Sequence, residues 1–287
     1  MNLDTSKKIL IVGLGLLGGS YAMALTKKGY RVTAITRSQS SIDYALEHGL
    51  IAEGAACVDP RLVAEADLCV FALYPNVFIK WIEENQNLFR TGTILTDVTG
   101  VKGCIVDKIQ SLLRPDLEFI AAHPMAGREV CGVEHSDDRI FRGANYVVTP
   151  SPRNTEDAIA LCKKLGETLG FANISVLSPA EHDEVIAFVS QLTHCIAIAL
   201  MTCQQNEHLE DYTGDSFRDL TRIARLNDEM WSELFLLNKP SLLSQIDLFI
   251  GELSRLKELL AKGDREGLRE MMRHSTARRA LFDKKPL

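Results

Sequence analysis

A glycine-rich turn near the N-terminus constrains the fold of this chain more than any other feature. An apolar run at residues 8–12 leads into G-L-G-L-L-G at residues 13–18, and a helical pattern follows directly. A strand that turns tightly into a helix presents free backbone N–H groups at the positive end of the helix dipole, where a pyrophosphate binds. This context favours a dinucleotide site over a glycine-rich turn without a ligand. The predicted cofactor contacts in the turn are Gly13, Gly15, Leu16, Leu17 and Gly18.

Strand and helix patterns alternate through the first part of the chain. Residues 68–73 are apolar on both faces, which is typical of a parallel strand covered by helices on two sides. Repeated β–α units of this kind predict an α/β fold with a doubly wound, mainly parallel sheet. Strands are expected near residues 8–12, 31–36, 67–73, 93–98, 118–122, 145–149 and 173–177.

The sequence changes character near Ser178 and Pro179, because no strand pattern follows them. We therefore predict two domains, a Rossmann-like dinucleotide-binding domain at residues 1–178 and an all-helical domain at residues 179–287. The helical patterns of the second domain extend over residues 180–207, 215–225, 240–262 and 264–282.

The helical pattern at residues 185–203 is apolar almost all round, so its side chains must be buried on several sides. A second subunit would bury them, and we predict a homodimer formed through the C-terminal helices. The alternative is a monomer whose own helices bury this stretch. Ser190, Gln191 and His194 interrupt the stretch, and it is too short to span a bilayer comfortably, so no membrane association is expected.

Composition excludes several other classes of protein. A formal net charge of -6 argues against a general nucleic-acid binder. The seven cysteines are scattered without a C-x-x-C pair or another metal-ligand spacing, which predicts no metal site. The N-terminus does not have the pattern of a signal peptide, so a reducing, cytoplasmic setting is expected.

The end of the second expected strand bears on the choice of cofactor. In NAD-binding chains an acidic residue at this position binds the ribose 2′-hydroxyl. Here the strand ends in Thr36, and Arg37 and Ser38 follow. A guanidinium with neighbouring hydroxyls suits a 2′-phosphate, and no carboxylate is there to repel it. The sequence favours NADP over NAD; the alternative is that Arg37 stacks on adenine or faces solvent.

Three later side chains are candidates for chemistry. His123 lies at the end of an expected buried strand, where an open α/β sheet binds its ligands, and is a candidate general base or a histidine hydrogen-bonded in a loop. His194 lies within the apolar helix, where a histidine is more often a satisfied core residue. Arg222 has apolar neighbours and needs an anion, which is either a ligand carboxylate or Asp219, three residues before it.

Taken together, these segments resemble the prephenate/arogenate dehydrogenases of tyrosine biosynthesis over nearly the whole chain. Beside the glycine turn, the motifs that carry the resemblance are T-D-V-x-x-V-K at Thr96–Lys102, H-P-M-A-G at His123–Gly127, F-R-G at Phe141–Gly143, S-x-L-x-H at Ser190–His194 and F-R-D-x-T-R-I-A at Phe217–Ala224. The resemblance implies an NADP-dependent dehydrogenase that oxidatively decarboxylates prephenate to 4-hydroxyphenylpyruvate; the alternative substrate is arogenate, which gives tyrosine.

The resemblance also implies roles for single residues. His123 matches the catalytic histidine that hydrogen-bonds the substrate hydroxyl, and His194 matches a second histidine in the pocket. Arg222 matches the arginine that binds a substrate carboxylate. Arg218 and Trp231 match positions that line the pocket. We also assign Asp97, near the end of the expected strand at residues 93–98, to the cofactor site.

One position departs from the family pattern. Many relatives have D-V-G-S-V-K, in which the serine hydroxyl contacts both the histidine and the substrate hydroxyl. Here Gly100 occupies the serine position and Thr99 precedes it. We expect either the Thr99 hydroxyl or a water to take the place of the serine, and we therefore include Thr99 among the substrate-binding candidates.

A different substrate, a different enzyme class and a non-catalytic protein are the alternatives to this interpretation. An acidic residue near the amine of arogenate would favour that substrate, and Glu129 is a candidate. A β-hydroxyacid or imine reductase shares the two-domain plan but usually relies on a lysine in the first long helix after the sheet, and residues 179–206 contain no lysine. A non-catalytic NADP-sensing protein would not need His123, His194 and Arg222 together.

Overall fold

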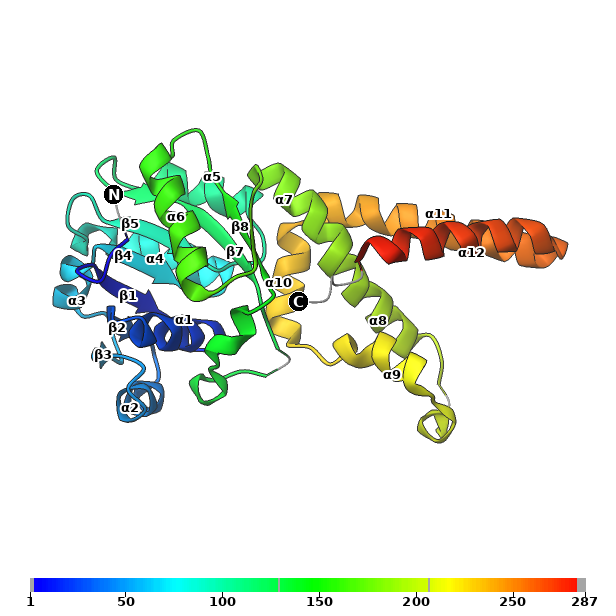
Figure 1. The fold of residues 1–287 in the computed structure, drawn as a ribbon, viewed down its shortest axis with the longest axis horizontal. Coiled ribbons are helices and arrows are strands. Elements are labelled where there is room, and N and C mark those ends of the chain that lie inside the picture. The colour runs from blue at the N-terminus through cyan, green and yellow to red at the C-terminus, as the bar shows by residue number, and fades with distance from the viewer. Residues whose placement is uncertain (1–2, 129, 206, 283–287) are drawn as a thin grey trace. The chain divides into compact units, whose positions relative to one another are not determined.

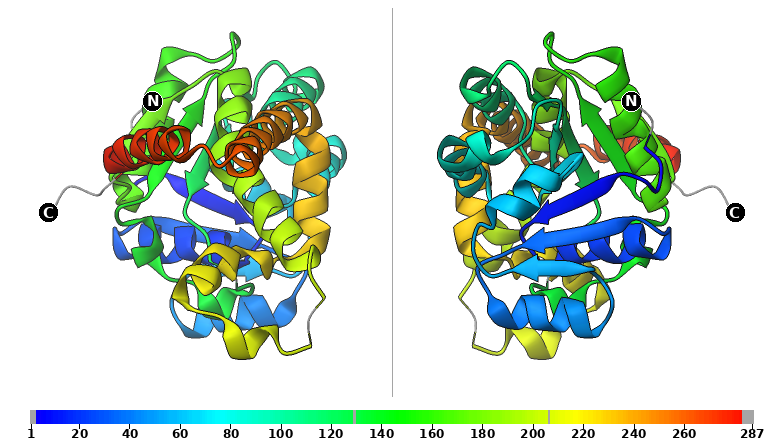
Figure 2. Two further views of the ribbon diagram at one scale, coloured as in Figure 1. Left: turned by 90° about the vertical axis from the view of Figure 1, so that its right-hand side faces the viewer. Right: turned by 90° about the vertical axis from the view of Figure 1, so that its left-hand side faces the viewer.

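A six-stranded parallel sheet forms the centre of the N-terminal half in this computed structural model, which describes residues 3–128, 130–205 and 207–282 (Figure 1). The strand order β3-β2-β1-β4-β5-β6 reverses direction between β1 and β4, which confirms the predicted doubly wound sheet. The right-hand view of Figure 2 shows β1, β2 and β3 as neighbouring blue arrows. The strands are β1 (Lys8–Val12), β2 (Arg31–Ile35), β3 (Glu53–Ala55), β4 (Leu68–Phe71), β5 (Ile94–Asp97) and β6 (Glu118–Phe119).

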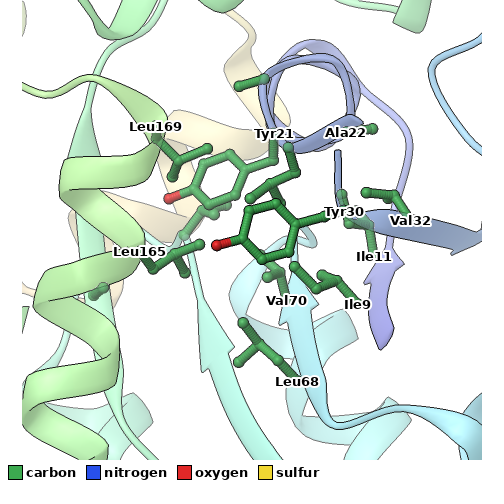
Figure 3. Packing of buried hydrophobic residues seen from close by; sticks show 14 of the residues in the cluster. Ile9, Ile11, Tyr21, Ala22, Tyr30, Val32, Leu68, Val70, Leu165 and Leu169 are labelled. Atoms are coloured by element: carbon green, nitrogen blue, oxygen red, sulfur yellow. The ribbon is translucent and has the colours of Figure 1, made fainter. Parts of the chain in front are cut away.

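Helices cover both faces of this sheet, because alternate residues of each strand enter opposite apolar cores. Ile9 and Ile11 of β1 share one core with Tyr21 of α1 and Leu165 of α6 (Figure 3), whereas Leu10 enters the other core, formed with α3, α4 and α5. The helices are α1 (Leu16–Lys27), α2 (Gln39–Glu47), α3 (Pro60–Glu65), α4 (Pro75–Asn85), α5 (Gly103–Leu112) and α6 (Glu156–Leu169).

The strand expected at residues 118–122 is divided between two sheets. β6 closes the edge of the first sheet, and β7 (Ala121–Met125) begins a second, three-stranded sheet with β8 (Asn145–Thr149) and β9 (Asn173–Val176). β7 pairs antiparallel with β8, and β8 pairs parallel with β9. The N-terminal part of β7 lies beside the end of β5, where the backbone N–H of Ala122 donates to Asp97.

A buried ion pair fixes this crossing between the sheets. The Lys102 ammonium and the Asp97 carboxylate are 2.6 Å apart and have no exposed side-chain surface. Asp97 Oδ1 accepts a hydrogen bond from the backbone N–H of Ala122 at 3.1 Å, and Lys102 Nζ donates to the Ala122 carbonyl at 2.6 Å. Both backbone polar groups of one β7 residue are thereby satisfied by the pair, so the pair holds β7 against β5.

The helical part of the chain begins with one continuous helix that contains a π-helical segment. A capping box between Ser178 and Glu181 starts α7 (Pro179–Ile186), the π-helix covers Ala187–Leu192, and α8 (Thr193–Thr202) follows. The remaining helices are α9 (Asp215–Thr221), α10 (Asp228–Leu237), α11 (Lys239–Lys262) and α12 (Arg265–Arg279). The sequence analysis did not predict α10, although the Asn227 side chain caps it by accepting from Met230 N–H.

Contacts divide the chain into two compact units, Met1–Lys239 and Pro240–Leu287, so that α7 to α10 belong to the same unit as both sheets. The domain boundary after residue 178 stays a prediction.

The helix Pro179–Thr202 leaves much of its apolar surface uncovered within this chain. The expectation that the apolar stretch is too short to span a bilayer was wrong, because this 24-residue helix is long and apolar enough to cross a membrane by length and composition alone. Of its apolar window, 28% is buried. Its exposed side chains include Phe188 at 50% and Met201 at 46%. The first compact unit therefore does not bury this stretch on several sides, as the alternative of a self-contained monomer would require.

We predict that Lys102→Met destabilises the protein by about 3–5 kcal/mol, because it leaves the buried Asp97 carboxylate without its counter-charge. Denaturant unfolding followed by circular dichroism measures the change. The matched control is Lys108→Met on α5, which removes a half-exposed pair with Glu83 and should cost no more than about 1 kcal/mol. Equal stability losses in the two variants would contradict the importance of the buried pair.

Candidate active site

The glycine turn after β1 has the geometry of a pyrophosphate site. Gly13 has a φ of 99°, which favours glycine, and a Cβ there would lie 2.4 Å from the Ala72 carbonyl oxygen. A Cβ on Gly18 would lie 1.9 Å from the Gly13 carbonyl oxygen, so Gly18 lets α1 pack closely on the turn. Gly15 has no atom within 4 Å of its Cβ position. The turn is therefore closed on the protein side and open at Gly15, as a bound dinucleotide requires.

The first turn of α1 supplies the donors of this site. Gly15 is the N-cap residue, α1 begins at Leu16, and no side chain caps the free N–H groups at this end. The backbone N–H groups of Leu16 and Leu17 lie in that first turn, at the positive end of the helix dipole. The predicted turn residues therefore fit a dinucleotide, through backbone donors and open space rather than through side chains.

The residues expected to read the ribose follow β2 directly. Thr36 donates its backbone N–H to the Ala55 carbonyl at 3.1 Å, and the Ser38 hydroxyl caps α2 by accepting from Ser41 N–H at 3.2 Å. Arg37 lies between them and is exposed. The Ser38 side chain thus caps α2, and Arg37 is the exposed cationic side chain of this loop.

His123 lies on β7 beside the crossing and is partly exposed. Its Nδ1 is 2.9 Å from Nε2 of His182, and Nδ1 of His182 is 2.8 Å from Oδ1 of Asp183. Burial, followed by the nearby His182 and Lys102, holds the pKa of His123 well below its ordinary value. The ring is therefore neutral near pH 7 and able to accept a proton.

The structure places Asp97 and Thr99 behind the site rather than in it. Asp97 is fully buried against Lys102, so it has no surface with which to contact a cofactor. The Thr99 hydroxyl is buried among Asp97, Lys102 Nζ and the carbonyl of Val101. Burial is the largest influence on the pKa of Lys102 and lowers it, while Asp97 opposes that shift. This geometry does not support cofactor contact by Asp97 or substrate contact by Thr99.

Gly100, rather than Thr99, is the residue next to the base. A Cβ at Gly100 would lie 3.8 Å from Nε2 of His123 and 3.7 Å from the methyl groups of Leu234 on α10. These are ordinary van der Waals distances, so a side chain could stand here without displacing its neighbours. The glycine leaves that volume open beside the nitrogen of His123.

The second histidine of the site, His194, stacks on Trp231, which the resemblance assigned to the lining of the pocket. The rings of His194 and Trp231 are 3.7 Å apart between centroids and inclined by 29°. His194 Nδ1 is 2.8 Å from the Ser190 carbonyl, so Nδ1 is the donor of this hydrogen bond. Trp231 lies one turn before Leu234 on α10, so both side chains project from one face of this helix. Trp231 contacts His194, and Leu234 lies next to Gly100, beside His123.

The two candidate arginines lie on α9 and on the 3-10 turn that follows it. Arg218 is exposed on α9 and pairs with Asp215 at 3.2 Å. Arg222 is also exposed and begins the 3-10 turn Arg222–Ala224, which packs against α8. The structure therefore brings Arg222 to the helix that carries His194, and it leaves Arg218 with a carboxylate partner on its own helix. Glu129, the candidate amine contact, lies outside the described residues.

Sequence reasoning missed two buried residues that support His123. His182 is 59 residues from His123 and Asp183 is 81 residues from Lys102, so no local pattern predicts these contacts. The one available signal was the run Glu181-His182-Asp183, which puts three polar residues at the start of an otherwise apolar helix.

Comparisons with known proteins agree with this geometry. Family models described as the nucleotide-binding domain and the dimerization domain of prephenate dehydrogenase match residues 21–175 and 178–274. The prephenate dehydrogenase of Bacillus subtilis is 29% identical over 269 residues, which are 91% of this chain and 72% of the relative. The cyclohexadienyl dehydrogenase of Zymomonas mobilis is 29% identical over 283 residues, 96% of each chain.

Solved structures show the same architecture. The prephenate dehydrogenase of A. aeolicus, in complex with hydroxyphenyl propionate and NAD+, superposes with a TM-score of 0.89 at 29% identity, over 99% of this chain and 100% of the other. The arogenate dehydrogenase of Synechocystis gives a TM-score of 0.83 at 25% identity, over 96% and 100%. With both of its halves matched, the chain belongs to the prephenate dehydrogenase family, whose members are NAD(P)-dependent oxidoreductases that couple dehydrogenation to decarboxylation.

Proposed function

We propose that this chain oxidatively decarboxylates prephenate to 4-hydroxyphenylpyruvate, with NADP as the preferred hydride acceptor. The observation that carries the proposal is the neutral, partly exposed imidazole of His123, which is held from behind by buried groups and has open volume beside Nε2. Membership of the family and the open glycine turn support the choice of a nicotinamide dinucleotide.

For this reaction the protein mainly has to align the two reactants and to accept a proton. When bound, the dinucleotide supplies the acceptor for the hydride that leaves the carbinol carbon of the substrate. Nε2 of His123 takes the proton of the substrate hydroxyl, and loss of CO2 then yields an aromatic ring. Because aromatisation makes the overall reaction strongly downhill, correct positioning supplies much of the rate enhancement.

Recognition of the substrate falls to the helical region. Trp231 and His194 form a flat, stacked surface suited to a six-membered ring. Arg222, on the turn that packs against α8, supplies a guanidinium for a substrate carboxylate, and Arg218 adds a second cation on the preceding helix. Arogenate differs only in carrying an amine where prephenate has a ketone, so these same contacts would serve it. The likeness to the Synechocystis arogenate dehydrogenase keeps it as the second candidate.

The assay is the rise in NADPH absorbance when the protein is mixed with NADP and either prephenate or arogenate. We expect His123→Asn to lower kcat by roughly 10²–10⁴-fold with little change in KM, because it removes the proton acceptor. Since the pKa of His123 is lowered, kcat/KM should hold as the pH falls to about 6.5 and decline only in more acidic solution. His48→Asn, at an exposed position on α2, is the matched control. Absence of NADPH formation with both substrates would overturn the proposal.

The preference for NADP is carried by Arg37. We predict that Arg37→Ala lowers kcat/KM for NADP by about 10–100-fold, which corresponds to the roughly 1.5–3 kcal/mol of a charged hydrogen bond, and leaves kcat/KM for NAD nearly unchanged. Steady-state kinetics of the one variant with both cofactors measures this, so NAD is the internal control. Equal losses with the two cofactors would show that Arg37 does not read the 2′-phosphate.

We also infer that the chain works as a homodimer formed through the C-terminal helices. The support is the match of residues 178–274 to a dimerization domain, together with the exposed apolar side chains of Val185, Phe188 and Met201. Sedimentation equilibrium should give twice the 31.9 kDa mass of one chain, and Phe188→Asp should lower the dimer fraction. A mass of one chain at all concentrations would contradict this assembly.

A further inference from the structure

Asp183, His182 and His123 form a hydrogen-bonded series, and the donors and acceptors along it fix where each hydrogen lies. The series begins at Asp183. Its Oδ1 accepts the backbone N–H of Lys102 at 2.8 Å, and its Oδ2 accepts the backbone N–H of Gly103 at 2.7 Å. A carboxylate has no hydrogen to donate, so Asp183 can only accept further hydrogen bonds from its other neighbours.

The direction of the remaining bonds follows from this fixed acceptor. Because Asp183 Oδ1 can only accept, Nδ1 of His182 must donate to it across their 2.8 Å contact. Burial lowers the pKa of His182, so this ring is neutral and its Nε2 carries a lone pair. Nδ1 of His123, 2.9 Å away, must therefore carry the hydrogen, and Nε2 of His123 is left without one.

We propose that Asp183 and His182 are positioning residues that hold His123 in the tautomer with hydrogen on Nδ1, so that Nε2 faces the substrate as the proton acceptor. This inference rests on the proposed function, in which Nε2 receives the proton of the substrate hydroxyl. The free nitrogen is the one beside the open volume at Gly100, as that role requires.

The surroundings of Asp183 are shaped for this task. A Cβ on Gly103 would lie 2.9 Å from Oδ2, so glycine permits the carboxylate to approach the start of α5 closely. The Asp183 carbonyl accepts from Nδ2 of Asn238 at 2.8 Å, and the same Nδ2 is 2.8 Å from Oε1 of Gln191 in the π-helix. All of these side chains are buried, so the helix turn that carries His182 and Asp183 is fixed on several sides.

The same groups set the charge that His123 meets when it becomes protonated. Lys102 opposes a positive imidazole, but its charge is balanced by Asp97, with which it is paired. Asp183 then remains as the uncompensated negative charge behind the two rings. The series therefore fixes the orientation of the His123 ring and prevents its rotation, as a carboxylate behind a histidine does in other acid–base enzymes.

The tautomer can be observed without substrate. Two-bond ¹H–¹⁵N correlation spectra of the full chain with ¹⁵N-labelled histidine distinguish Nδ1–H from Nε2–H, and His123→Gln identifies the His123 signals among the seven histidines. We expect Nδ1–H on both His123 and His182. Asp183→Ala removes the oxygen that accepts from His182 Nδ1–H and should allow Nε2–H to appear on both rings. Observation of Nε2–H on His123 in the unaltered protein would overturn the inference.

Kinetics provides the second readout. We expect Asp183→Ala and His182→Leu to lower kcat by roughly 10²–10⁴-fold without weakening dinucleotide binding, because a His123 ring without its fixed partner can carry hydrogen on the acceptor nitrogen. His182→Gln, whose amide oxygen can accept from His123 Nδ1–H, should retain most of the rate. Equal losses in His182→Gln and His182→Leu, at equal thermal stability, would also contradict the positioning role. The expected tautomers without turnover of either substrate would count against the proposed function alone.

Discussion

The buried contact between Asp97 and Lys102 is the interaction on which the rest of the site depends. Two charges without solvent are costly to bury, and the cost is offset here because both also bind the backbone of Ala122. The pair therefore does more than neutralise itself. It ends β5, starts the turn into α5 and locks β7 in place, and each of these elements contributes a part of the surroundings of His123.

The central strands and the doubly wound class of the sheet could be predicted from sequence because each of these strands is a local apolar run with its own turn signals. The glycine turn was readable for the same reason, since all of its contacts lie within a few residues or on the adjacent strand. β3 was not readable, because Glu53-Gly54-Ala55 has no apolar run and Gly54 is dictated by the close packing of Ile42 and Ile51. The division of residues 118–125 between two sheets was also hidden, because it is determined by the distant Asp97.

The residues of the candidate site likewise divide into those with a local sequence signal and those placed by contacts distant in sequence. His123, His194 and Trp231 could be found from motifs, and the structure places the latter two in direct contact. The family pattern also led to Thr99 as a substitute for serine, but the Cβ direction of residue 100 and the inward turn of the Thr99 hydroxyl depend on Lys102 and could not be read from spacing. His182 and Asp183 were invisible because an imidazole and a carboxylate next to each other at a helix start usually face water. Only the fold shows that these two are buried.

The continuous helix from Pro179 to Thr202 has two separate structural roles along its length. Its first turns hold the buried carboxylate and imidazole, and its following turns present bare aliphatic and aromatic surface. Such a helix has few positions at which a substitution has no effect, because each residue contributes either to the buried support of His123 or to the apolar surface. Substitutions along this segment therefore affect either the support of His123 or the exposed apolar surface, although the segment lies outside the nucleotide-binding motif.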